Sequence, residues 1–420
     1  MTQTEISHEA SPPRQAAPVE PAGVGEQQPS VGRLVGVDLA RALAVFGMFA
    51  VHVAPSAEDT SGFAGWMLEL AQGRSSILFA TLAGFSLMLI AGRREPKTGL
   101  AGRRAMARIV IRAVVLLVLG TALTMLKTGI LVILAFYGVY FLLALPLVRL
   151  RAKTLAITAA VLAFVAPPAA FGLNQLLTPS VTESINAYDP IARLGGDGLL
   201  SLLLNGTYPA ITWMPFVIAG MALARLDLAA GAVQRRLAAL GPAMIVLGYG
   251  SAWLIGKLVP SLHGVGSDVK DLFANLDAES LKALGPGDAA YEAIQDKITD
   301  DAYLALLVSD PHSGTTFEII GSLGVAITVL LCATVVMARL AWLRRLASPL
   351  IAVGTMSLTL YVAHVAAYTM LPDGATSTLV PLLGFIGGAI LFAAIWSRFF
   401  RRGPLEYLLN GTTKLAKFVR

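Results

Sequence analysis

Long apolar runs separated by short polar segments dominate the chain from residue 34 to residue 396. A mostly apolar run of roughly 17–25 residues can cross the hydrocarbon core of a bilayer as an α-helix. The pattern predicts ten helices, at about 34–54, 75–91, 109–125, 130–147, 155–173, 208–223, 243–258, 317–337, 350–370 and 378–396. The predicted fold class is therefore all-α, an integral membrane helical bundle in contact with the lipid bilayer.

Polar segments flank and interrupt this predicted membrane domain, residues 32–403. Residues 1–31 are rich in Pro, Glu and Gln and contain no apolar run, which predicts a disordered cytoplasmic tail rather than a signal peptide. Residues 404–420 are predicted to form a basic cytoplasmic C-terminal tail. The longest interruption is an outer loop, residues 261–315, which contains ten acidic residues and three lysines.

Lysine and arginine residues follow the second, fourth, sixth, eighth and tenth predicted helices, whereas the loops between them are neutral or acidic. Loops rich in Lys and Arg stay on the cytoplasmic side of a membrane. The alternation therefore predicts that both chain termini are cytoplasmic.

Composition supports a membrane protein and argues against several soluble classes. Of 420 residues, 56% are hydrophobic and 14% are charged, and the mean hydropathy is +0.70, whereas soluble domains are nearer half apolar and a quarter charged. The net charge of +6 does not indicate a nucleic-acid partner, because the basic residues gather in the loops of one side. Cys332 is the single cysteine, so no intrachain disulfide is possible. No zinc-type Cys/His spacing, Walker loop or dinucleotide fingerprint occurs, and no metal is predicted.

Three polar residues interrupt the first apolar run on a single stripe: Asp38, Arg41 and His52. Charged groups in hydrocarbon are costly, so they are rare there and mark functional sites. At about 100° per residue, Arg41 and His52 fall within roughly 20° of each other around the helix, and Asp38 within about 40° of His52. Arg41 and His52 lie roughly 16 Å apart along the axis, about half a bilayer.

Four of the five histidines fall at or near the predicted outer face: His52, His263, His312 and His364. Imidazole transfers protons near neutral pH. We therefore predict that His52 is a general base, with His364 as a second catalytic candidate. The alternative for each histidine is a structural hydrogen bond to a neighbouring helix.

Several motifs resemble known membrane acyltransferases. The Arg41-(ten residues)-His52 spacing and the segment Gly73–Leu87 are similar to the first two helices of acyltransferase family three. A closer similarity is to the YeiB-like bacterial membrane proteins and to heparan-alpha-glucosaminide N-acetyltransferase, and it rests on VDLARALAVFGM, LAFYGVYFLLALPL (Leu134–Leu147), YPAITWMPFVIAGMALARL (Tyr208–Leu226), MSLTLYVAH (Met356–His364) and GPLEYLL (Gly403–Leu409). His52 corresponds to the histidine of the family-three motif. It does not correspond cleanly to the reactive histidine of the heparan enzyme, which comes slightly later in its motif.

This resemblance implies transfer of an acyl group, most often acetyl, from cytoplasmic acyl-CoA to an acceptor across the membrane. It further implies that His52 is the general base on an acceptor hydroxyl or amine, or carries a transient acyl group. The acceptor is expected to be a glycan or glycolipid of the cell envelope, and the location the bacterial plasma membrane. Donor phosphates are expected at the basic segment 93–112, through Arg103, Arg104 and Arg108.

Each remaining candidate has a structural alternative. Arg41 either holds the donor or pairs with Asp38, which lowers the cost of inserting the charge into the membrane. For Asp38, the role of structural partner to Arg41 is favoured over a role in substrate binding. Arg74 either binds an acidic acceptor or reaches to the interface. His312 either caps the eighth helix, a role for which Ser313 and Thr315 are also suited, or lines the acceptor site. Trp213 is either a substrate platform or a packing aromatic.

Two other function classes fit the same sequence. A transporter or flippase for a small polar or lipid-linked substrate also needs intramembrane charges and kinked helices, although no repeat relates the two halves. A non-catalytic scaffold or sensor would use the acidic loop 261–315. The sequence leaves open the acceptor, the acyl chain and whether the protein is a homo-oligomer.

Overall fold

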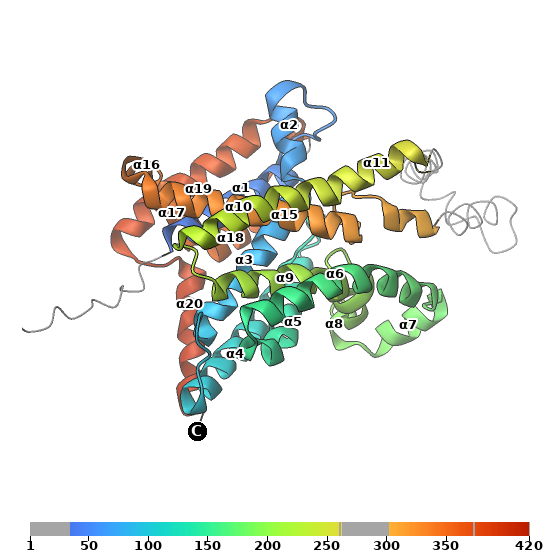
Figure 1. Ribbon diagram of the computed structural model, residues 1–420, viewed down its shortest axis with the longest axis horizontal. Coiled ribbons are helices and arrows are strands. Elements are labelled where there is room, and N and C mark those ends of the chain that lie inside the picture. Colours follow the sequence, from blue (N-terminus) through green and yellow to red (C-terminus); the bar gives the residue numbers. More distant parts are fainter. Residues whose placement is uncertain (1–33, 260–261, 263–301, 373, 420) are drawn as a thin grey trace, which may run out of the picture. The chain divides into compact units, whose positions relative to one another are not determined.

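The computed structural model describes residues 34–259, 262, 302–372 and 374–419 (Figure 1). Apart from Leu34, all of these residues belong to one compact unit, Val35–Arg420. The predicted tail 1–31 and residues 263–301 of the predicted outer loop lie outside the described residues. Every regular element within the described ranges is a helix, which confirms the all-α prediction. Among the described residues, seven helices are long and apolar enough to cross a membrane, or eight if one sharply bent pair counts as a span. The count of ten spans and the cytoplasmic termini stay predictions.

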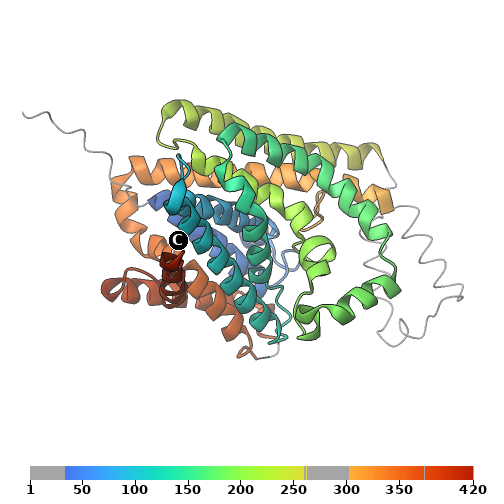
Figure 2. The same ribbon diagram turned by 90° about the horizontal axis from the view of Figure 1, so that it is seen from below.

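Six of these helices are single long rods. They are α1 (Val35–Val53), α3 (Arg74–Ala91), α4 (Gly99–Thr124), α6 (Ala152–Gln175), α15 (Thr316–Arg339) and α19 (Val380–Phe399). The seventh is made of α10 (Gly231–Ile245), η3 (Val246–Gly250) and α11 (Ser251–Leu258), and it runs alongside α15 (Figures 1 and 2). The bent pair is α17 (Ser348–Thr355) and α18 (Ser357–Tyr368), which meet at 81°.

Two shorter apolar helices lie among the long ones. They are α5 (Leu134–Ala144), continued by η1 (Leu145–Arg149), and α9 (Ala210–Arg225). The remaining elements are α2 (Gly62–Ala71), α7 (Pro179–Tyr188), α8 (Pro190–Arg193), η2 (Ser201–Asn205), η5 (Ala302–Leu307), α16 (Ala341–Leu346), η6 (Ala375–Ser377), α20 (Pro404–Thr412) and η7 (Thr413–Phe418). The apolar runs of the sequence therefore all form helices, but they differ in length and continuity.

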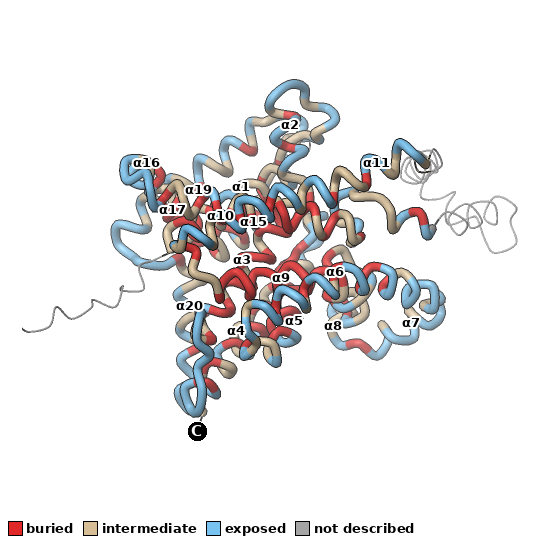
Figure 3. The backbone as a smooth tube through the Cα atoms, viewed as in Figure 1, coloured by how far each residue is buried: buried red, intermediate tan, exposed pale blue. Residues whose placement is uncertain are grey.

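The core of the bundle is built on α9 and α3. All residues of α9 from Thr212 to Arg225 are buried, and α3 is the most buried of the long helices, whereas α19 and the α10–α11 rod are mostly exposed (Figure 3). Exposed apolar faces on outer helices are what lipid covers in a membrane protein. The short helix α9 is therefore surrounded by protein rather than by lipid.

Two glycines allow α3 and α9 to pack closely. A Cβ at Gly84 would lie 2.0 Å from the carbonyl oxygen of Val217, and a Cβ at Gly220 would lie 1.8 Å from that of Thr81. Small residues at such crossings let two helix backbones approach and pack tightly. The contact fixes α9 against α3 at the centre of the bundle.

Gly220→Ala is expected to destabilise the protein by about 1–3 kcal/mol, because the added methyl group forces the α3 and α9 backbones apart. Thermal unfolding in detergent measures the change. Gly384→Ala on α19 is the matched control, since a Cβ there meets no atom within 4 Å. Equal melting temperatures for the two variants would contradict the close contact.

Two helices begin earlier than the sequence predicts. Helix α4 begins at Gly99, inside the basic segment 93–112, rather than near residue 109, and α10 begins at Gly231 rather than near residue 243. Long basic side chains keep their charges in water while the backbone stays helical, so a helix continues past its apolar run. The α6 helix also continues through Pro167 and Pro168. The Thr316 hydroxyl donates to the Ala163 carbonyl at 2.9 Å and satisfies the acceptor that Pro167 leaves without an amide partner.

The predicted helix 350–370 breaks at Met356, and Glu406 of α20 stabilises the break. The Glu406 carboxylate accepts hydrogen bonds from the backbone amides of Leu358 (2.8 Å) and Thr359 (3.3 Å) and from the Thr359 hydroxyl (2.5 Å). The first amides of a helix have no partner within it and attract negative charge. A residue distant in sequence therefore caps α18.

One arginine joins three helix ends that the charge pattern places on the cytoplasmic side. Arg225 at the end of α9 donates to the carbonyl oxygens of Arg93, after α3, and Val148, in η1, at 2.5 Å each. The second, fourth and sixth predicted helices therefore end close together.

Candidate active site

His52 and His364 form a hydrogen-bonded pair between α1 and α18. The Nδ1 of His52 lies 2.9 Å from the Nε2 of His364, and the ring planes are nearly parallel, at 6°. His364 is 2% exposed and is packed between the rings of Phe49 and Tyr361. The break that starts α18 gives this helix its own direction, distinct from that of α17, so the pair depends on tertiary structure.

The hydrogen-bond partners of the two rings indicate which ring nitrogen of each histidine carries the proton. The buried Nδ1 of His364 makes no hydrogen bond of regular geometry, while the imidazole interacts with the backbone of Leu360 and Tyr361, whose carbonyl oxygens can only accept a proton. A proton on this Nδ1 leaves the His364 Nε2 as an acceptor, so the His52 Nδ1 must donate to it. The Nε2 of His52 then carries a lone pair and can act as a base.

A small cavity lies beside His52. Its volume is about 20 Å³, and its lining includes His52, Ser76, Tyr208, His312 and Tyr361. A space of this size holds about one water molecule and no sugar. The cavity brings together the end of α1, the start of α3, the segment before α9 and the loop before α15. In this state it is closed to a substrate.

Glu318 holds the loop that carries His312. The backbone of His312 adopts a left-handed conformation, with φ of 65°. The Glu318 carboxylate, which is buried, accepts hydrogen bonds from the amides of His312 and Gly314, at 2.6 Å each, and from the Ser313 hydroxyl at 3.2 Å. A non-glycine residue keeps a left-handed backbone conformation only where the surrounding contacts hold it there. For His312, these contacts are the hydrogen bonds to Glu318.

Two different residues of this loop cap helix α15 and line the cavity. Thr315 caps α15, because its hydroxyl accepts from the Glu318 amide at 3.1 Å. His312 lines the cavity, and its Nε2 lies 3.4 Å from the Ser76 hydroxyl. Thr315 rather than His312 therefore caps the helix, and the predicted role of His312 in the acceptor site stays a prediction. Burial lowers the pKa of the His312 imidazole below its usual value.

Trp213 packs behind the cavity rather than in its wall. It is 1% exposed, and its ring contacts Tyr208 at 4.9 Å and His312 at 6.0 Å between centroids. The indole therefore positions the two side chains that do line the cavity, as expected for a packing aromatic.

Arg74 is engaged at the side of this site. Its Nε donates to the Tyr249 hydroxyl at 3.1 Å and its Nη1 to the Glu69 carbonyl at 2.8 Å, and its guanidinium lies over the Tyr249 ring. These contacts are a structural use of the side chain, and Arg74 is not among the residues that line the cavity.

Arg41 belongs to a second group of polar side chains on α1, nearer the N-terminus of this helix than His52. Its guanidinium pairs with Asp38 at 2.7 Å and donates to the Ser86 hydroxyl at 2.7 Å, so the Asp38 carboxylate is a salt-bridge partner of Arg41. It also lies within electrostatic range of Arg112 on α4 and Glu406 on α20. Arg402 acts on Arg112 as well. Helix α1 therefore connects the histidine pair to a cationic cluster of Arg41, Arg112 and Arg402.

The three arginines predicted to bind the donor do not converge on one side chain or cavity. Arg103 and Arg108 are exposed on α4, and Arg104 donates to the Val419 carbonyl at 3.2 Å. They lie on the same helix as Arg112, toward its N-terminus. Their role in donor binding stays a prediction.

Sequence analysis missed four residues that shape these sites: Glu318, Glu406, Arg112 and Tyr361. A signal existed for Glu318 and Arg112, because each is an ionisable residue inside an apolar run. None existed for Glu406 and Tyr361, which act through distant segments. Within the described ranges, no group of three or more His, Cys, Asp and Glu residues could hold a metal ion.

Two protein families match the chain. The profile described as "Heparan-alpha-glucosaminide N-acetyltransferase, catalytic" matches residues 33–254, more than half of the chain. The profile described as "Protein of unknown function (DUF418)" matches residues 302–415. Together they include every motif of the closer resemblance, which is thereby confirmed. No curated protein matches the chain significantly.

Proposed function

The chain belongs to the family of heparan-alpha-glucosaminide N-acetyltransferase catalytic domains, and from this premise we propose that it transfers an acetyl group across a membrane. The donor is acetyl-CoA on the cytoplasmic side. The acceptor is a hydroxyl or amine of an extracytoplasmic glycan or glycolipid.

The observation that carries this proposal is the His52–His364 pair beside the cavity. In the tautomers assigned above, the His52 Nε2 accepts the proton of the acceptor hydroxyl or amine as that group attacks the acetyl carbonyl. The carbon–sulfur bond of the thioester then breaks, and CoA leaves as a thiolate that takes up a proton. His364 keeps the His52 ring in the productive tautomer and acts as a positioning residue. Positioned general bases contribute about 10²–10⁴-fold to rate.

The cationic cluster of Arg41, Arg112 and Arg402 has the charge needed to bind the phosphate groups of the donor. Acetyl-CoA, when bound, supplies an acetyl group activated as a thioester. Among the described residues, the carboxylates that act on Arg41 and Arg112 are those of Asp38 and Glu406, so the three arginines of the cluster leave positive charge in excess for phosphate groups. These arginines would hold the nucleotide end and orient the thioester toward His52.

Arg112→Ala is expected to raise the KM for acetyl-CoA about tenfold, because one charge-assisted contact to phosphate is lost. The KM for S-acetyl-pantetheine, which lacks the nucleotide phosphates, should not change. Steady-state kinetics with both donors measures the difference.

Arg235→Ala on α10 is the matched control, since this arginine is exposed and outside the cluster. An equal rise in KM for both donors in Arg112→Ala would show that the variant perturbs the fold rather than phosphate binding.

The function itself is tested in proteoliposomes that contain methyl glucosaminide and receive acetyl-labelled acetyl-CoA outside. We expect labelled, acetylated sugar to accumulate inside. Release of unmodified sugar without acetylation would support transport instead, and the proposal would be wrong.

A further inference from the structure

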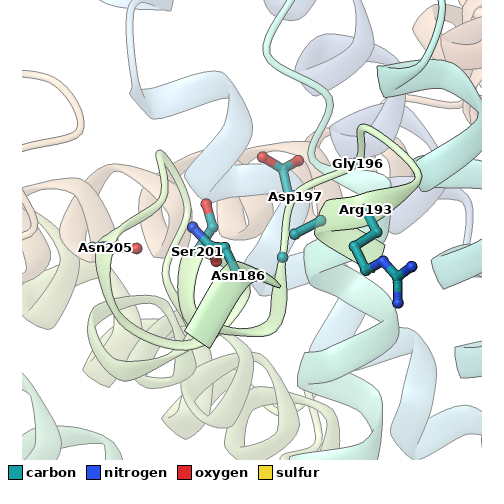
Figure 4. Close-up of a pocket in the computed structure, with 8 residues that line it drawn as sticks. Asn186, Arg193, Gly196, Asp197, Ser201 and Asn205 are labelled. Carbon is teal, nitrogen blue, oxygen red and sulfur yellow. The ribbon is translucent and has the colours of Figure 1, made fainter. Parts of the chain in front are cut away.

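A second cavity lies in the segment between α6 and α9. Its volume is about 490 Å³, within the usual range of small-molecule sites. Its lining comprises Asn186, Ala192, Arg193, Gly196, Asp197, Gly198, Ser201 and Asn205 (Figure 4). Unlike the cavity at His52, it has room for a sugar ring.

The lining of this cavity is polar and has unused hydrogen-bonding capacity. None of its five polar side chains makes a side-chain hydrogen bond or ion pair within the part of the chain that the structure describes. Figure 4 shows the Arg193 guanidinium pointing away from Asp197. Amide and hydroxyl groups both donate and accept, as sugar hydroxyls do, whereas a lipid chain would find only Ala192 as an apolar side chain.

The walls of the cavity are held in place by Asp189. This carboxylate is buried, and it accepts hydrogen bonds from the amides of Ile191, at 2.8 Å, and Leu199. It thus ties the start of α8 to the chain that leads into η2. A site formed before its ligand arrives loses less entropy on binding.

Tyr208 relates this cavity to the histidine site, because it lines the cavity at His52 and is close enough to Asp197 for an electrostatic interaction. The Tyr208 ring also contacts the His312 ring, at 5.3 Å between centroids. Burial raises the pKa of Asp197, so a hydrogen-bond donor on a ligand would stabilise its carboxylate.

We propose that the cavity of residues 186–205 binds a sugar ring of the acceptor through its hydroxyl groups and places the neighbouring hydroxyl or amine near Tyr208 and His52. Only the second half of this statement rests on the proposed acetyl transfer. Sugar binding by the cavity stands independently of it.

Saturation-transfer NMR on the full-length protein in nanodiscs, with methyl glucoside and methyl glucosaminide as probes, tests the binding. Asp197→Asn and Asn186→Ala are expected to weaken it at least tenfold. Glu183→Gln is the matched control, because Glu183 is exposed on α7 and lies outside the lining. Wild-type binding in both cavity variants, at unchanged melting temperature, would overturn the proposal.

Transfer kinetics separates this inference from the proposed function. If both hold, the cavity variants raise the KM for methyl glucosaminide about tenfold and leave kcat and the KM for acetyl-CoA unchanged. Transfer with an unchanged sugar KM would reject the cavity and keep the function. Sugar binding that depends on Asp197, in a protein without transfer activity, would reject the function and keep the cavity.

Discussion

His52→Gln is expected to reduce acetyl transfer by about 10²–10⁴-fold, because the variant loses the only ring nitrogen that the assigned tautomers leave free to accept a proton. Glutamine can still hydrogen-bond to the His364 Nε2, so the packing between α1 and α18 should survive. The proteoliposome assay measures transfer, and thermal unfolding shows whether the fold is intact. The KM for acetyl-CoA should stay the same, since the donor cluster lies elsewhere on α1.

His8→Gln is the matched control for this substitution. Transfer that persists in His52→Gln at near wild-type rate would reject His52 as the base. His364→Gln should lower kcat less than His52→Gln does, because His364 acts through its neighbour. The two substitutions together should cost no more than His52→Gln alone, as is usual for residues that act as a unit.

Glu318→Ala is expected to destabilise the protein by about 3 kcal/mol, since three hydrogen bonds to one buried carboxylate are lost. The freed loop should also displace His312 from the cavity wall, so transfer should fall even where the protein remains folded. Thermal unfolding and the transfer assay, each at several temperatures, measure the two effects.

Glu69→Ala on α2 is the matched control for Glu318→Ala, because the Glu69 side chain is exposed. A melting temperature of Glu318→Ala equal to that of Glu69→Ala would show that the loop does not depend on the carboxylate. His312→Gly separates the two effects further: glycine accepts the left-handed backbone, so stability should hold while the imidazole is lost.

Local sequence patterns were sufficient for some parts of the site. The spacing of Asp38 and Arg41 places them one turn apart, and their salt bridge follows from helix geometry alone. The stripe on the first apolar run predicted that His52 and Arg41 mark two separate polar groups on one helix. The structure contains both groups, one with His364 and one with Arg112 and Glu406.

Other parts depended on contacts between distant segments. Nothing near Met356 in the sequence predicts a break, because the Glu406 carboxylate that stabilises the start of α18 lies 50 residues later. The continuation of α6 through Pro167 depends in the same way on the Thr316 hydroxyl. Both cases concern a backbone group whose partner is a side chain of another element.

The sequence by itself determined the helical class, the approximate position of each apolar segment and the polar stripe of α1, because these follow from residue type and a period of 3.6 residues. Only the tertiary structure decided that α9 is buried, that α18 brings His364 to His52, and that Glu318 places His312 in the cavity wall. The physical reason is that lipid and protein interior are both apolar. Hydrophobicity therefore predicts that a segment leaves water, and not which neighbour it meets.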